Sequence, residues 1–208
     1  MPEPALDRDQ LETAARILAR RDPDLGGILD RLGPPPLWDR EPGFATLVAI
    51  VLEQQVSLQS GAAALERLCR AAGSIDPEAI VRLGEENARA AGLTRQKARY
   101  VVALAEATRS GRFDATRIAA ASDDDARAQL TALLGIGRWT ADIYLLMALG
   151  RPDVWPDGDL ALATAMRRAK GLTALPDAGA QRQVADAWRP WRAVAARLLW
   201  HAYLAGER

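Results

Sequence analysis

Cysteine and histidine are almost absent from this chain of 208 residues. The one cysteine, Cys69, excludes an internal disulfide, a four-thiolate zinc site and an iron-sulfur cluster. The one histidine, His201, excludes a histidine-rich metal site, so we expect no metal held by side chains. Because 27 basic residues are balanced by 27 acidic ones, a protein that coats nucleic acid non-specifically is disfavoured. Any contact with DNA must be local.

Long apolar runs are also missing. No stretch approaches the ~18 apolar residues that a membrane span requires, and the N-terminal residues lack the pattern of a secretory leader. We therefore expect a cytoplasmic protein with no membrane contact. The composition, 49% hydrophobic and 26% charged, is typical of a globular protein. A single domain over residues 1–208, present as a monomer, is the simplest expectation.

Helical periodicity dominates, and no segment alternates between apolar and polar residues as a half-buried strand does. The sequence predicts an all-α fold of about ten short helices, arranged around one core or in two closely packed lobes. The spacing of Phe44, Leu47, Val48, Val51 and Leu52 predicts an amphipathic helix that ends at the polar residues 53–55. The segment 138–149 is apolar nearly all round, which predicts a deeply buried helix.

A Gly-x-Gly turn, Gly135-Ile136-Gly137, precedes that buried helix. Glycines allow a tight turn between helices and let backbone N–H groups point outward at an anion. Further on, a loop stiffened by two prolines presents Asp159 at the start of a predicted helix over 160–170. The pattern indicates backbone amides that hold a phosphate (a phosphate clamp), followed by a single carboxylate that acts on the nucleotide beside that phosphate.

Asp159 has a simpler interpretation, because aspartate is favoured as a helix cap. Asp159 can cap the helix and act as the reactive carboxylate at the same time. Asp157 is the competing carboxylate of the same loop.

In the last helix, Trp200 lies off the predicted apolar stripe of Trp191, Val194, Ala195, Leu198 and Ala202, so it must face solvent or line a cavity. Lys97 and Arg99 are interpreted as a solvated helix face.

Four segments resemble the helix-hairpin-helix DNA glycosylases, and among them the 3-methyladenine DNA glycosylase II branch in a short form without its N-terminal sheet domain. They are FATLVAIVLEQQVS from residue 44, GLTRQKARYVVALA from residue 92, the stretch 133–162, and WRPWRAVAARLLW from residue 188. The resemblance covers roughly residues 40–205. It implies two packed lobes with a cleft between them and a helix-hairpin-helix motif at about 128–150.

The resemblance assigns the catalytic role to Asp159 and the base pocket to Trp139 and Trp200, joined by Tyr144 and Leu160. Packing in the protein core is the alternative for Trp139 and Tyr144. Trp139 stands where relatives that also cut the DNA strand have a lysine nucleophile, which implies a monofunctional enzyme without lyase activity. Because this sequence has Ile143 and Leu160 where relatives have pocket tyrosines, its pocket is less aromatic.

The resemblance also implies the DNA contacts. The amides of Gly135, Ile136 and Gly137, together with Thr140, would hold a backbone phosphate. The resemblance implies no cofactor apart from a monovalent cation on the hairpin carbonyls. The loop at 54–55 would fill the gap left by an extruded base, with Gln55 preferred over Gln54. Two solvated glutamines at a helix end are the alternative.

The function expected from this resemblance is excision of alkylated purines, such as 3-methyladenine and 7-methylguanine, from double-stranded DNA by base flipping and hydrolysis of the N-glycosidic bond. A protein with this function would be associated with the nucleoid in the cytoplasm. Two alternatives remain open: a glycosylase for deaminated or oxidised bases, and a DNA-binding protein that uses the hairpin without catalysis.

Overall fold

The structure is a computed structural model that describes residues 5–206. These residues form twelve α-helices and one 3-10 helix, with no strand among them, so the all-α expectation is confirmed. The number exceeds ten because short segments such as α7 (Ala115–Ala120) form helices behind their own cap, here Asp114. No helix within residues 5–206 is long and apolar enough to cross a membrane.

The chain divides into two compact units. The first comprises residues 40–144, and the second comprises residues 5–39 with 145–206. The remaining helices are α1 (Arg8–Arg21), α2 (Pro23–Leu32), α3 (Phe44–Glu53), α4 (Leu58–Ala72), α5 (Pro77–Ala90), α6 (Arg95–Arg109), α8 (Asp123–Thr131), α9 (Arg138–Met147), α10 (Leu160–Ala169), α11 (Ala178–Ala185), the 3-10 helix Asp186–Trp188, and α12 (Arg192–Leu204).

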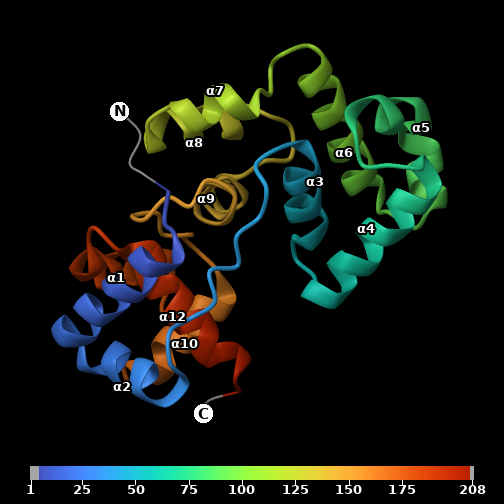
Figure 1. Ribbon diagram of the computed structural model, residues 1–208. Helices are drawn as coiled ribbons and strands as arrows, with labels where there is room; N and C mark the ends of the chain where they lie inside the picture. Colours follow the sequence, from blue (N-terminus) through green and yellow to red (C-terminus); the bar gives the residue numbers. More distant parts are fainter. Residues whose placement is uncertain (1–4, 207–208) are drawn as a thin grey trace. The chain divides into compact units, whose positions relative to one another are not determined.

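Helix α3 forms the core of the first unit and packs against α4 and α6, while α5 lies beside α6 (Figure 1). It is more buried than an amphipathic helix with one apolar stripe, because neighbours cover it from several sides. Its fully buried side chains are Leu47, Val48, Ile50, Val51 and Leu52. The helix ends at Glu53, as expected from the polar break, and Gln55 then adopts a left-handed φ of 56°.

Helices α8 and α9 form the predicted helix-hairpin-helix motif. Ser122 caps α8 by accepting a hydrogen bond from the Asp125 amide, and its hydroxyl donates to the Asp125 carboxylate. The second half of a capping box, a return bond to the Ser122 amide, is replaced by this side-chain bond. In α9, every side chain from Thr140 to Leu146 is buried, which confirms the deeply buried helix.

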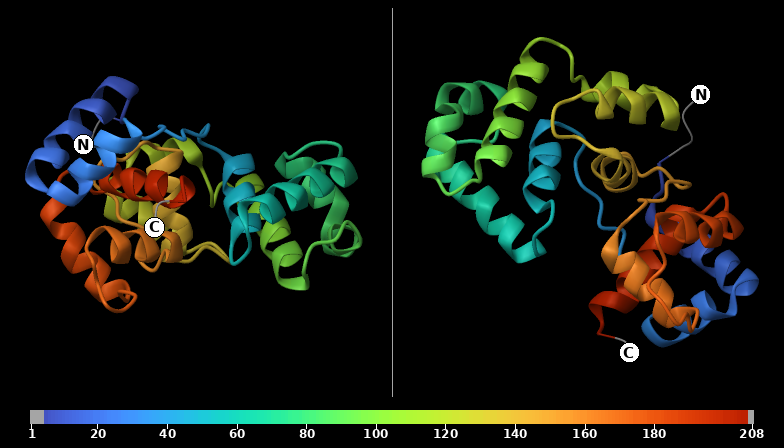
Figure 2. Two further views of the ribbon diagram at one scale, coloured as in Figure 1. Left: turned by 90° about the horizontal axis from the view of Figure 1, so that it is seen from below. Right: turned by 180° about the vertical axis from the view of Figure 1, so that it is seen from behind.

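Helix α12 is the centre of the second unit, where it packs against α1, α2 and α10. Both views of Figure 2 show α1 and α2 beside α10 and α12. All residues from Ala193 to Trp200 are buried. The prediction of a single apolar stripe on this helix was wrong, because neighbouring helices cover α12 on several faces. Residues 5–43 form α1, α2 and a loop instead of a sheet.

Candidate active site

Asp159 is the N-terminal cap of α10. Its Oδ1 atom accepts a hydrogen bond from the Leu162 amide at 2.9 Å and from the Trp200 indole Nε1 at 3.3 Å. The cap expected from the sequence is confirmed, and an indole donor is added to it. Two N–H donors fix the orientation of the carboxylate and direct positive dipole ends toward its charge. The half-buried Asp159 is therefore a rigidly held acidic group at a helix N-terminus.

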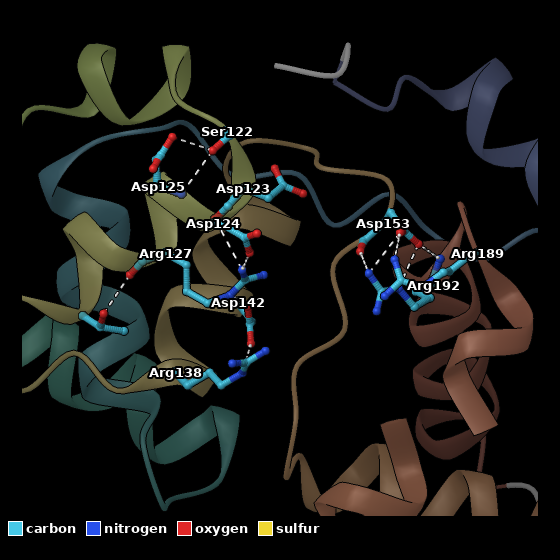
Figure 3. A network of polar contacts seen from close by, with 11 residues as sticks. Ser122, Asp123, Asp124, Asp125, Arg127, Arg138, Asp142, Asp153, Arg189 and Arg192 are labelled. Carbon is cyan, nitrogen blue, oxygen red and sulfur yellow. Dashed lines mark hydrogen bonds and ion pairs between the residues drawn. The ribbon is translucent and has the colours of Figure 1, made fainter. Parts of the chain in front are cut away.

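The loop that carries Asp159 is anchored to the start of α12 (Figure 3). Arg192 donates from Nε to Asp153 Oδ1 at 2.9 Å and from Nη2 to the Asp153 carbonyl at 2.6 Å. Arg189 donates to Asp153 Oδ2 at 2.9 Å. Pro152 and Pro156 restrict the same loop. These contacts reduce the freedom of the loop, as a loop that presents a reactive group requires.

Asp157, the competing carboxylate, has a different environment. Its side chain is 7% exposed and pairs with Arg182, with 3.2 Å between Oδ2 and Nε. A carboxylate that is buried in an ion pair serves the packing of α11. We therefore keep Asp159 as the candidate.

Trp200 is 8% exposed, so it does not face solvent. Besides its bond to Asp159, its ring contacts Trp38 edge to face, with 6.5 Å between ring centroids and 72° between planes. Trp38 is a residue of this site that the sequence did not predict. The available signal was a lone tryptophan two positions after the Pro34-Pro35-Pro36 run, in a segment with no helical pattern.

The hairpin requires a glycine at position 135. Gly135 has a φ of 84°, and a Cβ atom there would lie 2.3 Å from Cγ of Tyr100. The Ile136 amide donates to the Leu133 carbonyl at 3.2 Å, and the Ile136 side chain is buried. Among the residues that the structure describes, the Gly135 and Gly137 amides have no acceptor. The amides available for an anion are thus those of the two glycines, since Ile136 uses its own inside the turn.

Gln54 is bound to the hairpin. Its Nε2 atom donates to the Gly135 carbonyl at 3.0 Å and to Thr140 Oγ1 at 2.9 Å. Thr140 is 2% exposed, so its hydroxyl serves Gln54 inside the unit. Gln55 is exposed on a left-handed backbone. Of the two glutamines, Gln55 is the one whose side chain is accessible to a partner.

The expectation that Lys97 lies on a solvated helix face was wrong. Its Nζ donates to the Leu52 carbonyl near the end of α3 at 2.7 Å, and the side chain is half-buried. Burial lowers the pKa of this ammonium group. Because a cation satisfies a carbonyl at the C-terminus of a helix, Lys97 stabilises the end of α3 that leads into the glutamine loop. Arg99 is exposed, as expected.

A buried carboxylate, Asp142, joins the two helices of the hairpin motif (Figure 3). It is fully buried and accepts from Arg127 Nε at 2.7 Å, and Arg138 Nε lies 3.7 Å away. Burial by itself would lower the pKa of Arg127, but the hydrogen bond and charge of Asp142, together with the charges of Asp124 and Asp123, outweigh burial and raise it. The pairing of Asp142 was not predicted from the sequence, although an aspartate inside an apolar helix is a signal for a buried partner.

The other expected pocket residues have different degrees of exposure. Trp139 is half-buried, whereas Ile143 and Tyr144 are buried. The Tyr144 hydroxyl accepts from the Gly43 amide at 2.9 Å, and burial raises its pKa to about 12. Leu160, which directly follows Asp159, is 68% exposed. An exposed leucine beside the carboxylate is accessible to a ligand, while Tyr144 has a packing contact in its own unit.

Comparison with known proteins identifies the family. A family model described as HhH-GPD superfamily base excision DNA repair protein matches residues 48–190. The chain therefore belongs to the HhH-GPD superfamily of base excision DNA repair proteins.

Relatives of known name include DNA-3-methyladenine glycosylase 1 of Schizosaccharomyces pombe, 30% identical over 94% of this chain and 92% of the relative. DNA-3-methyladenine glycosylase 2 of Escherichia coli is 28% identical over 85% of this chain. The chain spans 65% of the length of that protein, and also 65% of the Bacillus subtilis protein YfjP, to which it is 25% identical.

Solved structures agree with this family. The S. pombe 3-methyladenine DNA glycosylase Mag1, solved in complex with abasic DNA, matches with a TM-score of 0.85 and 27% identity over 90% of this chain and 95% of that one. A DNA-3-methyladenine glycosidase from Bacillus halodurans matches with a TM-score of 0.79 and 30% identity over 93% and 91% of the two chains.

Proposed function

We propose that this protein is a monofunctional DNA glycosylase that acts as a monomer and removes alkylated purines, such as 3-methyladenine and 7-methylguanine, from double-stranded DNA. The observation that carries the proposal is the Asp159 carboxylate, held by the Leu162 amide and the Trp200 indole at the start of α10. Relatives with the names of 3-methyladenine glycosylases support the substrate class.

Removal of an alkylated base requires few catalytic groups from the protein. Alkylation of a ring nitrogen gives the base a positive charge, so the base leaves as a neutral molecule and no general acid is needed. The protein has to stabilise the oxocarbenium-like sugar and direct water to it. The negative charge of Asp159 suits both tasks. The base that departs takes the electron pair of the glycosidic bond, and water supplies the hydroxyl group at the sugar carbon.

DNA is held by backbone amides. The two amides of Gly135 and Gly137 would bind a phosphate at the start of α9, and the exposed Gln55 would enter the stack when the damaged nucleotide swings out. The Gly135 carbonyl accepts a hydrogen bond from Gln54, so a monovalent cation would use its second lone pair or other hairpin carbonyls. No step depends on that cation.

Trp139 supports the absence of lyase activity. Strand cutting by this class of chemistry needs an amine that attacks the sugar carbon and forms a Schiff base, and an indole cannot do so. The product is therefore an abasic site in an intact strand.

The test is to incubate methylated duplex with the purified protein and identify the released bases by mass. Asp159→Asn keeps the helix cap, since asparagine caps as well as aspartate, so it should keep affinity for duplex DNA and lose base release. Asp157→Asn is the matched control and should release bases at the wild-type rate. Unchanged release by Asp159→Asn would contradict the assignment, and release of deaminated or oxidised bases alone would favour the alternative substrate. A strand that is cut without alkali would contradict the monofunctional mechanism.

A further inference from the structure

We propose that Trp38, in the loop between α2 and α3, is a specificity-determining residue that adds a second indole surface to the site of Asp159. This inference rests on the proposed function and deepens it. Trp38 contacts the ring of Trp200, and Trp200 in turn donates to Asp159. The three side chains form one continuous chain of contacts inside the second unit.

Trp38 has an unusual backbone. Its φ of 48° lies in the left-handed region, and among the described residues only Trp38 and Gln55 are non-glycine residues with positive φ. Such a conformation is strained for a residue other than glycine, and it persists only where the surroundings impose it. Residues of this kind cluster at functional sites. A bulky aromatic residue in this conformation therefore needs a structural cause.

The cause is Arg197, a fully buried arginine of α12. Its Nε donates to the carbonyl of Leu37, the residue before Trp38, at 2.8 Å, and Nη2 donates to the Leu146 carbonyl at 2.9 Å. Burial lowers the pKa of Arg197 to about 10, against the opposing effect of the negative charge of Asp39, the residue after Trp38. Arg197 thus acts on both neighbours of Trp38 and fixes the loop to α12.

The arrangement presents aromatic surface next to Trp200, the indole that donates to the carboxylate. Trp38 is half-buried and therefore keeps accessible surface, while Trp200 is almost covered. Trp38 also contacts the ring of His201 edge to face, at 87°. Indole faces attract cations, and an N-alkylated purine carries a positive charge whereas its unmodified parent is neutral. Trp38 would therefore favour the alkylated base over the parent base of the same shape.

The test uses the Asp159→Asn protein, which is proposed to bind without releasing the base. The measured quantity is the ratio of affinities for duplexes that contain 7-methylguanine or guanine at one position. Adding Trp38→Leu, which keeps apolar volume and removes the ring, should lower this ratio by about three- to thirtyfold. Adding Trp38→Phe should keep most of the ratio. Affinity for an abasic duplex, which has no base to stack, should stay unchanged in both.

Trp191→Leu is the matched control, because Trp191 is another half-buried tryptophan of the same unit and has no ring contact with Trp200 among the described residues. An unchanged ratio in Trp38→Leu would overturn the inference, as would equal losses for the 7-methylguanine, guanine and abasic duplexes. A ratio near one in the Asp159→Asn parent, with release of 7-methylguanine by the wild type, would overturn it too. Failure of the wild type to release any alkylated purine would instead reject the proposed function.

Discussion

The side-chain amide of Gln54 donates a hydrogen bond to the carbonyl oxygen of Gly135 at 3.0 Å. This bond joins the loop after α3 to the hairpin before α9, across 81 positions of the chain. Gln55, the proposed plug, follows directly, and the Gly135 amide belongs to the proposed phosphate clamp. The relative position of plug and clamp is therefore set by one amide group inside the first unit.

Replacing Gln54 should test this coupling. In Gln54→Ala the loop loses both bonds, so we expect weaker binding of abasic duplex, slower release of 7-methylguanine, and a loss of about 1–2 kcal/mol in the free energy of unfolding. Binding, single-turnover release and urea unfolding measure the three effects. Gln59→Ala, at an exposed glutamine of α4, is the control. Wild-type DNA affinity in Gln54→Ala would contradict the coupling.

Replacing Gly135 separates backbone strain from a clash. Gly135→Ala places a Cβ atom against the Tyr100 ring at a φ of 84°, whereas Gly73→Ala has a similar φ of 87° and meets open space. We expect about 1–2 kcal/mol of destabilisation at Gly73 and at least about 2 kcal/mol more at Gly135, measured by urea unfolding. Adding Tyr100→Ala should recover part of the difference. Equal losses at the two glycines would show that the ring moves away freely.

The acidic partners of Arg127 offer a comparison of buried and exposed charge. Asp142 is fully buried, whereas the Asp124 side chain, which contacts the same guanidinium at 2.8 Å, is 98% exposed. Asp142→Asn should lower the free energy of unfolding by about 3 kcal/mol, because it removes the buried counter-charge of Arg127 and leaves only the exposed carboxylate of Asp124. Asp124→Asn should cost less than about 0.5 kcal/mol. Chemical unfolding of both variants measures these losses of stability. Similar losses in the two variants would refute the role of Asp142 as a buried counter-charge.

Tyr144 should make stability depend on alkaline pH. Its pKa rises to about 12 in the folded state, above the unperturbed value of about 10. Protonation of the buried hydroxyl therefore contributes stability that is fully present below pH 10 and is lost as the pH rises to 12, by up to about 2.7 kcal/mol. Tyr144→Phe should remove this loss, and Tyr203→Phe, at an exposed tyrosine, should retain it. Parallel stability curves for wild type and Tyr144→Phe between pH 9 and 12 would exclude the effect.

Local signals were enough to predict the helices and the turns. The periodic residues of α3, the Gly-x-Gly turn and the cap at Asp159 each depend on a few neighbouring residues. Their structure follows from hydrogen bonds and steric limits over three or four positions. The sequence therefore indicated the all-α fold, the hairpin motif and the candidate carboxylate. It was wrong about the face of Lys97 and the single stripe of α12, because these depend on which helices pack against them.

The sequence by itself determined where the chain turns, where its helices begin, and which acidic side chain stands at the start of α10. The tertiary structure decided the partners: Trp200 for Asp159, Trp38 for Trp200, Gln54 for Gly135, and Arg197 for the Leu37 carbonyl. The residues of these pairs are separated by 41 to 162 positions in the chain. The smallest separation is that of Asp159 and Trp200, and the largest is that of Trp38 and Trp200. Contacts of this range follow from the packing of whole helices, which no local pattern encodes.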